Sequence, residues 1–215
     1  VVGMNGSGKT TFIKLLCRLY DPTEGEILLN GINIQKYNYH EYMSIFPVVF
    51  QDFQLVSFSL GQNVAAKVSY DGKKAKSCLD SVGFTQRLGE MTMGLETSLY
   101  KDFDEDGIDI SGGEAQKIAL SRALYKDAQF IILDEPTAAL DPIAEAEVYN
   151  RMNEIVDGKT AVFISHRLSS CRFCQNIAVF HEGRLIQRGD HDKLLADVGG
   201  KYYELWNAQA QYYTE

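Results

Sequence analysis

The chain has little positive charge and no long apolar run. Its 215 residues include 21 Lys and Arg against 29 Asp and Glu, a formal net charge of -8. Because proteins bind nucleic acids through clustered positive charge, this balance argues against nucleic acid as the main partner. A membrane-spanning helix needs about 20 predominantly apolar residues, and no segment of the sequence has that character. The sequence also opens without a charged leader, so we expect no signal peptide.

Cysteine is scarce, and its distribution does not suggest a disulfide framework. Of the four cysteines, Cys171 and Cys174 have C-x-x-C spacing, but no second pair and no thioredoxin-like pattern surrounds them. Neither a zinc site nor a redox centre is therefore expected, and the thiols are predicted to be free in a reducing cytoplasm. The sequence shows no internal repeat. With 45% hydrophobic residues, it can bury the core of one domain, or of one domain with a subdomain.

A glycine-rich loop near the start carries the strongest signal. Residues 3–10 read GMNGSGKT, which fits the phosphate-binding pattern G-x-x-x-x-G-K-[ST]. Small residues let consecutive backbone N–H groups approach phosphate oxygens, Lys9 adds charge at the β- and γ-phosphates, and Thr10 offers a hydroxyl to Mg²⁺. A predicted helix over residues 11–16 directs its N-terminal dipole at the anion. The residues expected to bind ATP or GTP here are Asn5, Gly6, Ser7, Gly8, Lys9, Thr10 and Thr11.

An apolar run that ends in two carboxylates indicates hydrolysis of the bound nucleotide. Residues 130–133 read FIIL and are followed by Asp134 and Glu135. Such a run is typical of a buried parallel strand, and open α/β sheets bind ligands at the carboxyl ends of these strands. There Asp134 can hold the water shell of the metal while Glu135 accepts a proton from an attacking water. Alone the pattern fits a capped core strand equally well, but the phosphate loop favours a catalytic site.

A third motif resembles one that is typical of a known protein family. Residues 110–124 read ISGGEAQKIALSRAL, in which Ser111 and Glu114 have the spacing of a capping box. This spacing predicts a helix that starts with two glycine amides, those of Gly112 and Gly113, at its positive end, which makes a second anion site. The stretch resembles the signature motif of the ATP-binding cassette (ABC) ATPases, with Ile in place of the usual leading Leu. The resemblance extends over essentially the whole chain.

Three further elements of that family follow in the expected order. Gln51 resembles the Q-loop glutamine that senses Mg²⁺ and the membrane partner, Asp141 resembles the D-loop, and His166 resembles the switch histidine at the γ-phosphate. A lone histidine after a strand is more often structural, but its spacing after Asp134-Glu135 favours the switch role. The resemblance implies catalytic roles for Glu135, His166, Lys9 and Gln51. It implies metal contacts by Thr10, Gln51 and Asp134, and nucleotide contacts by the loop together with Ser111, Gly112, Gly113 and Asp141.

The resemblance also implies the fold and its division. We expect an α/β fold, a P-loop NTPase (RecA-like) core formed by residues 1–58 and 127–215, with an inserted α-helical subdomain over 59–126. The family places its first antiparallel strands and an adenine-stacking aromatic upstream of the phosphate loop, whereas only two residues precede Gly3 here. We therefore expect the N-terminal antiparallel β part to be truncated and ATP affinity to be reduced.

The pattern within these regions predicts individual elements. Helices of the inserted subdomain are expected to break at Gly72, Gly83, Gly89 and Gly94. Strands are expected around residues 25–29, 45–50, 130–133, 160–164 and 177–180, and helices over 143–156, near Cys171, and over 201–213.

The family resemblance implies a working unit of two cassettes. Each ATP lies between the phosphate loop of one chain and Ser111 to Gly113 of another, which is either identical or different, and hydrolysis releases the closed pair. The sequence SHRL around His166 and the C-terminal segment resemble exporter cassettes. We therefore expect an ATPase domain at the cytoplasmic face of a membrane, partnered with transmembrane domains.

Two alternatives stay open. One is an ABC ATPase of DNA repair or translation, although the long coiled-coil insertion of the former and the tandem cassette of the latter are missing. The other is a regulatory cassette that binds ATP without turnover, against which intact Glu135, His166 and Ser111 argue.

Overall fold

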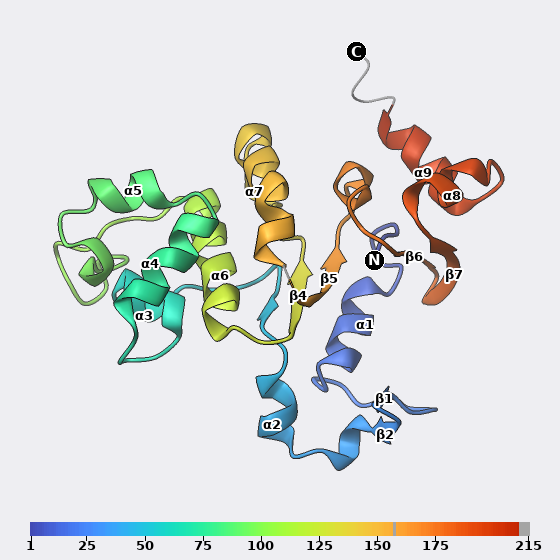
Figure 1. The fold of residues 1–215 in the computed structure, drawn as a ribbon, viewed down its shortest axis with the longest axis horizontal. Helices are drawn as coiled ribbons and strands as arrows, with labels where there is room; N and C mark the ends of the chain where they lie inside the picture. Colours follow the sequence, from blue (N-terminus) through green and yellow to red (C-terminus); the bar gives the residue numbers. More distant parts are fainter. Residues whose placement is uncertain (157, 211–215) are drawn as a thin grey trace. The chain divides into compact units, whose positions relative to one another are not determined.

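The chain folds into two compact units, each with its own core. The computed structural model describes residues 1–156 and 158–210; its ribbon is shown in Figure 1. The first unit comprises residues 1–44 and 162–215, and the second comprises residues 45–161. Among the described residues, none of the helices combines the length and the hydropathy that crossing a bilayer requires.

The elements of the first unit come from both ends of the chain. In order they are α1 (Lys9–Leu16), β1 (Leu28–Leu29), β2 (Ile32–Asn33), η1 (Ile34–Lys36), α2 (Tyr39–Ser44), η3 (Leu168–Cys171), β6 (Ile177–His181), β7 (Arg184–Gly189), α8 (His191–Ala196) and α9 (Lys201–Ala210). Those of the second unit are β3 (Val48–Val49), α3 (Leu60–Ala65), α4 (Gly72–Ser81), α5 (Thr85–Glu90), η2 (Gly94–Glu96), α6 (Gly112–Lys126), β4 (Phe130–Asp134) and α7 (Pro142–Ile155). The boundary between the units falls inside β5 (Thr160–Ile164).

A hairpin organises the first unit. Strands β6 and β7 pair antiparallel, and the two residues of their turn, Glu182 and Gly183, have φ angles of 49° and 74°. Positive φ at both positions matches the twist of paired strands. Val2 lies beside β6: its amide donates to the Ala178 carbonyl at 2.9 Å, and its carbonyl accepts from the Phe180 amide at 2.8 Å. The chain therefore enters the glycine-rich loop from a position fixed against β6.

Apolar side chains around this hairpin form the core of the first unit. Its buried members are Val2, Leu168, Cys171, Ile177, Val179, Leu194 and Tyr202. Burial raises the pKa of the Cys171 thiol to about 11, so this cysteine stays protonated at neutral pH and serves as a small apolar side chain.

Helix α6 is the centre of the second unit. It packs against α3 and α4 (Figure 1), and its buried residues include Ile118 and Leu120. Strands β3 and β4 pair parallel, with Val48 opposite Ile132 and Val49 opposite Leu133. Because β4 has buried residues on both faces, its side chains form an uninterrupted apolar run, as a parallel strand requires.

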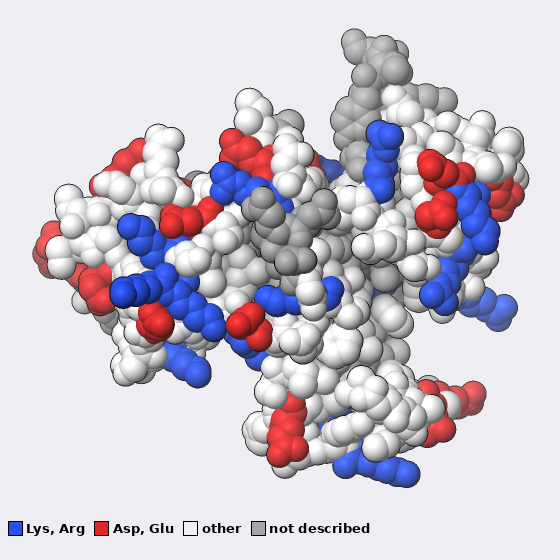
Figure 2. Space-filling model, in the orientation of Figure 1, with Lys and Arg blue, Asp and Glu red and all other residues white. Residues whose placement is uncertain are grey.

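Charged side chains of both signs are interspersed over the helices of the second unit (Figure 2). Arg87 Nε lies 2.6 Å from Glu114 Oε1, and Lys159 Nζ lies 3.1 Å from Asp127 Oδ1. The Arg87 contact matters for the site, because Glu114 belongs to the capping box at the start of α6.

Several predicted elements need correction. Gly72 and Gly89 do not break helices: Gly72 is the first residue of α4 behind the Asp71 N-cap, and Gly89 lies within α5. The strands predicted over 25–29 and 45–50 shorten to β1 and β3, and the helix near Cys171 is the short 3₁₀ helix η3. The predicted helix over 201–213 is confirmed as far as Ala210, and its remainder lies outside the described residues.

Two longer predictions agree with the structure. The run over 160–164 matches β5, and the helix predicted over 143–156 is α7, which begins one residue earlier and ends at Ile155. The predicted helical subdomain, residues 59–126, contains helices α3 to α6, and its boundaries stay a prediction.

Candidate functional site

The glycine-rich loop closes around its own lysine. The Lys9 ammonium donates to the carbonyls of Gly3 at 2.8 Å and Met4 at 2.9 Å, and the Ser7 amide donates to the Met4 carbonyl at 3.1 Å. Lys9 is only 7% exposed. These hydrogen bonds hold the loop in a compact turn with the buried Lys9 ammonium at its centre. Helix α1 follows the turn directly in sequence.

The polar groups of this loop fit an anion. The Ser7 hydroxyl is buried and has no hydrogen-bond partner among the described residues, although buried hydroxyls normally have one. Helix α1 starts directly after Gly8, its N-cap residue. No side chain among the described residues donates or accepts a capping hydrogen bond there, and the first turn contains no acidic residue. Its first N–H groups therefore carry the uncompensated positive end of the helix dipole. Phosphate oxygens match these donors.

Gly3 has no room for a side chain, and a side chain on Gly8 would press on the backbone of the β6–β7 turn. A Cβ on Gly3 would lie 2.3 Å from the Phe180 carbonyl oxygen, and one on Gly8 would lie 3.2 Å from Gly183 Cα. The Gly183 amide also donates to the Ser7 carbonyl at 3.0 Å. The β6–β7 turn therefore holds the loop from behind. The sequence analysis did not connect the segment after the predicted strand 177–180 with the loop, because the two are far apart along the chain.

His166 belongs to the same unit and lies at a cavity beside the loop. The cavity has a volume of about 300 Å³ and is lined by Gly3, Met4, Asn5, His166, Leu168, Leu205 and Gln209. Gln209 on α9 donates to the His166 carbonyl and accepts from the Leu168 amide at 2.8 Å. The structure thus brings together two of the predicted site residues, Asn5 and His166, and α9 holds the backbone at the histidine.

In the second unit, the strand register places Gln51 and Asp134 at the same edge. Val49 lies opposite Leu133 in the parallel pair of β3 and β4, and Gln51 and Asp134 follow these two residues. Asp134 is 4% exposed. Since the carboxyl ends of parallel strands meet at one edge, Asp134 and the turn that carries Gln51 both follow strand ends at that edge of the sheet.

The capping box predicted at Ser111 is confirmed. The Ser111 amide donates to Glu114 Oε2 at 2.8 Å, and the Glu114 amide donates to Ser111 Oγ at 3.3 Å. Burial alone would raise the pKa of Glu114, but the hydrogen bonds from Ser111 and the nearby Arg87 guanidinium lower it. Ser111 and Gly112 are exposed. The first turn of α6 is therefore exposed at Ser111 and Gly112, and the capping hydrogen bonds together with the Arg87 guanidinium hold Glu114 at its start.

A tight loop after β4 begins at Glu135 and ends at Asp141. Glu135 has a φ of 51°, a left-handed conformation that is uncommon for a residue with a side chain. Asp141 Oδ1 accepts from the amides of Ile143 at 2.9 Å and Ala144 at 3.0 Å, and the Ala144 hydrogen bond is the main cause that lowers the pKa of Asp141. Asp141 therefore caps α7 here, and its contact with nucleotide stays a prediction.

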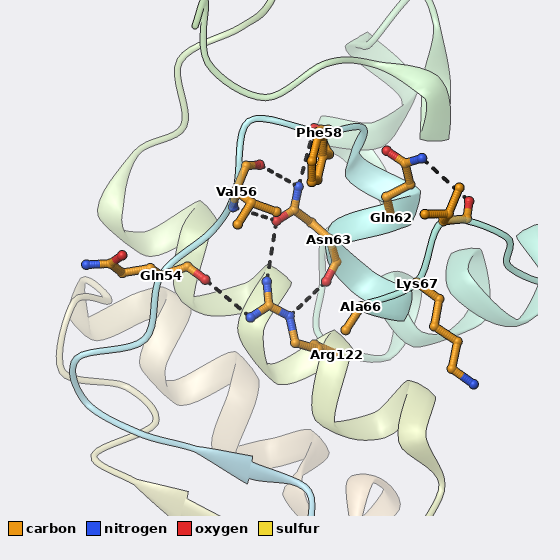
Figure 3. A pocket seen from close by; sticks show the side chains of 9 residues that line it. Gln54, Val56, Phe58, Gln62, Asn63, Ala66, Lys67 and Arg122 are labelled. Atoms are coloured by element: carbon orange, nitrogen blue, oxygen red, sulfur yellow. Dashed lines mark hydrogen bonds between the residues drawn. The ribbon is translucent and has the colours of Figure 1, made fainter. Parts of the chain in front are cut away.

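A hydrogen-bonded cluster around the buried Asn63 fastens the segment that follows Gln51 to α6 (Figure 3). The Arg122 guanidinium donates to the Asn63 carbonyl at 2.8 Å and to the Gln54 carbonyl at 3.2 Å. Asn63 is fully buried, and its side chain donates to the Val56 carbonyl at 2.8 Å and accepts from the Val56 amide at 2.9 Å. Sequence reasoning passed over both residues, although an arginine on the buried side of a helix is a signal that such a cluster exists.

We expect Arg122→Met to destabilise this unit. The substitution keeps an apolar stem but leaves the Gln54 and Asn63 carbonyls without the guanidinium, which should cost about 1–3 kcal/mol. For a chain of this size the melting temperature should fall by roughly 2–10 °C. Lys67→Met is the matched control, because Lys67 lines the same pocket and is exposed. Equal melting temperatures for the two variants in thermal unfolding would contradict the structural role of Arg122.

The described residues include no group of three or more His, Cys, Asp and Glu side chains arranged to hold a metal ion. Mg²⁺ in nucleotide sites is commonly held by few protein ligands together with several phosphate or water oxygens.

Comparisons with known proteins agree with this geometry. A sequence profile described as ABC transporter matches residues 1–138. An ATP-dependent lipid A-core flippase of Burkholderia orbicola (strain AU 1054) is 36% identical over 98% of this chain and 35% of its own length. The subtilin transport ATP-binding protein SpaT of Bacillus subtilis is 40% identical over 91% of this chain and 32% of its own length. The chain thus spans about a third of these relatives.

A solved structure resembles the whole described fold. The structure of a bacterial Atm1-family ABC exporter with ATP bound matches with a TM-score of 0.88 at 31% identity, over 97% of this chain and 36% of that one.

Proposed function

Since this chain belongs to the ABC transporter family and forms an exporter-type ATP-binding domain with ATPase activity, we propose that it couples ATP binding and hydrolysis to export across a membrane. The observation that carries the proposal is the phosphate loop, in which a buried lysine, an unpartnered Ser7 hydroxyl and the uncapped start of α1 form an anion site. An exported substrate and transmembrane domains are part of this proposal.

The proposed roles follow the chemistry of each side chain. Asn5 to Thr11 bind the phosphates through backbone amides and the Lys9 charge, Glu135 is the general base for the attacking water, and His166 and Lys9 stabilise charge on the transferred phosphoryl group. Thr10, Gln51 and Asp134 would hold Mg²⁺ together with phosphate oxygens. Bound Mg²⁺ would neutralise negative charge on the phosphates.

We propose further that two cassettes share each ATP. The start of α6 offers the backbone amides of Gly112 and Gly113 to an anion, and the nucleotide of a second cassette would meet them there. Asp141 would contact the same nucleotide pair. ATP then holds two cassettes together and hydrolysis releases them, because the γ-phosphate is the group that both chains bind. The lipid A-core flippase and the exporter support transmembrane domains as further partners, with the chain at the cytoplasmic face.

A cross-linking experiment on the natural full chain tests the shared site. In the Glu135→Gln background, which slows hydrolysis, Asn5→Cys and Ser111→Cys are combined, since both positions are exposed. With a mild oxidant such as copper phenanthroline added to accept the electrons of the two thiols, we expect ATP to promote a disulfide-linked species of doubled mass on non-reducing gels. The natural cysteines interfere little, because three are buried and Cys174 is half-buried.

Single-cysteine variants and samples without ATP are the controls, and they should stay at monomer mass. A doubled mass that is independent of ATP, or none at all with the cysteine pair, would overturn the proposal of a composite site. The regulatory alternative, a cassette without turnover, would be supported if the unsubstituted chain bound ATP but released no phosphate.

A further inference from the structure

Gln116 lies between the start of α6 and the loop that carries Glu135. It is 3% exposed. Its side-chain amide donates to the Glu135 carbonyl at 2.8 Å, and its side-chain oxygen accepts from the Ala139 amide at 2.8 Å. The nitrogen and the oxygen of this buried amide group thus both form hydrogen bonds to the same loop. The two bonds fix the distance and the orientation of that loop relative to α6.

The loop needs such a restraint. Glu135 has its left-handed φ of 51°, a conformation that is unfavourable for a residue with a side chain and persists only where the surroundings enforce it. Within the loop, the Ala138 amide donates to the Glu135 carbonyl at 3.1 Å and the Leu140 amide to the Thr137 carbonyl at 3.1 Å. Gln116 adds a hydrogen bond to the same Glu135 carbonyl from another element of the unit.

The start of α6 also packs directly on this loop. A Cβ on Gly112 would lie 3.6 Å from Ala139 Cβ, and one on Gly113 would lie 3.4 Å from Leu140 Cδ2. The first turn of α6 and residues 135–140 are therefore in contact on one side and hydrogen-bonded through Gln116 one turn further along. A displacement of the α6 start relative to the loop would strain both contacts.

We propose that Gln116 is a positioning residue that orients Glu135 for hydrolysis by tying its backbone to the start of α6. The inference rests on the proposed role of Glu135 as general base. Gln116 acts on the Glu135 backbone rather than on nucleotide. Because Ser111 to Gly113 precede it on the same helix, the position of the base is set relative to the surface that would bind the nucleotide of the second cassette.

The test compares Gln116→Leu, Gln116→Glu and Ser121→Ala in the natural full chain. Gln116→Leu removes both hydrogen bonds, whereas Gln116→Glu keeps the acceptor for Ala139 and removes the donor to Glu135 when ionised. Ser121→Ala is the control, since Ser121 is fully buried on the same helix and its hydroxyl, among the described residues, donates to the Cys78 and Lys117 carbonyls.

A role of Gln116 in orienting Glu135 and a role in fold stability alone predict different kinetics. For both Gln116 variants we expect kcat to fall about ten- to a hundredfold, because a misplaced catalytic group loses rate on this scale, while KM for ATP stays within about twofold. Ser121→Ala should lower the melting temperature and leave kcat unchanged. Unchanged kcat in Gln116→Leu, or an equal fall in Ser121→Ala, would overturn the positioning role.

The cross-link between Asn5→Cys and Ser111→Cys separates this inference from the proposed function. With ATP the link should still form when Gln116→Leu replaces Glu135→Gln as the slowing substitution. If the link forms but Gln116→Leu hydrolyses ATP at the normal rate, only the positioning role is wrong. If no link forms in either background, the composite site itself is wrong.

Discussion

Glu135→Gln should nearly abolish steady-state ATP hydrolysis while the chain still binds ATP. Glutamine keeps the shape of the side chain but cannot accept the proton of the attacking water, and loss of a general base lowers kcat by roughly 100- to 10,000-fold. The left-handed backbone at Glu135 and the Gln116 hydrogen bond to its carbonyl do not involve the carboxylate. We therefore expect the fold of the loop to survive. Phosphate release and equilibrium ATP binding on the same protein measure the two effects.

Glu147→Gln is the matched control. It is the same substitution on α7 in the same unit, at an exposed position to which we assign no catalytic role. Its turnover should stay within about twofold of the unsubstituted chain. Normal turnover in Glu135→Gln would show that another group takes the proton.

Lys9→Ala should weaken ATP binding itself. The substitution removes the charge at the centre of the loop, and loss of a charge-assisted hydrogen bond is worth about 1.5–3 kcal/mol, which corresponds to a roughly 10- to 100-fold rise in Kd for ATP. Because the Lys9 ammonium also bonds to the Gly3 and Met4 carbonyls, the loop should lose order at the same time. Isothermal titration with ATP measures the affinity.

Lys14→Ala provides the comparison, since Lys14 lies on the same helix and its ammonium lies over the Tyr20 ring at 5.4 Å. Its Kd should stay within about twofold of the unsubstituted value. Equal affinities for all three proteins would mean that the loop does not bind phosphate through Lys9.

The sequence by itself determined the features whose physics is local. A capping box needs only Ser111 and Glu114 three residues apart, so its spacing predicted where α6 begins. The phosphate loop was equally readable, because small residues, a lysine and a following helix are neighbours along the chain. The apolar run before Asp134 gave the buried strand β4 for the same reason.

Local patterns misjudged the elements whose boundaries depend on their surroundings. Gly89 disfavours a helix by about 1 kcal/mol relative to alanine, yet it lies within α5, and Gly72 begins α4 because the Asp71 side chain accepts from the amides of Lys73 and Lys74. The strand predicted over 45–50 keeps only two residues, Val48 and Val49, which pair with Ile132 and Leu133 of the five-residue strand β4.

Only the tertiary structure decided what holds the site residues in place. The Gly183 amide reaches the Ser7 carbonyl, the Arg122 guanidinium reaches the Gln54 carbonyl, and Gln116 reaches the Glu135 carbonyl. Each of these hydrogen bonds joins residues well separated in sequence, and a hydrogen bond forms only within about 3 Å and with the right direction. Residue order carries no such information until the chain is folded. The groups proposed for chemistry were therefore readable from the sequence, whereas the groups that orient them became visible only in the fold.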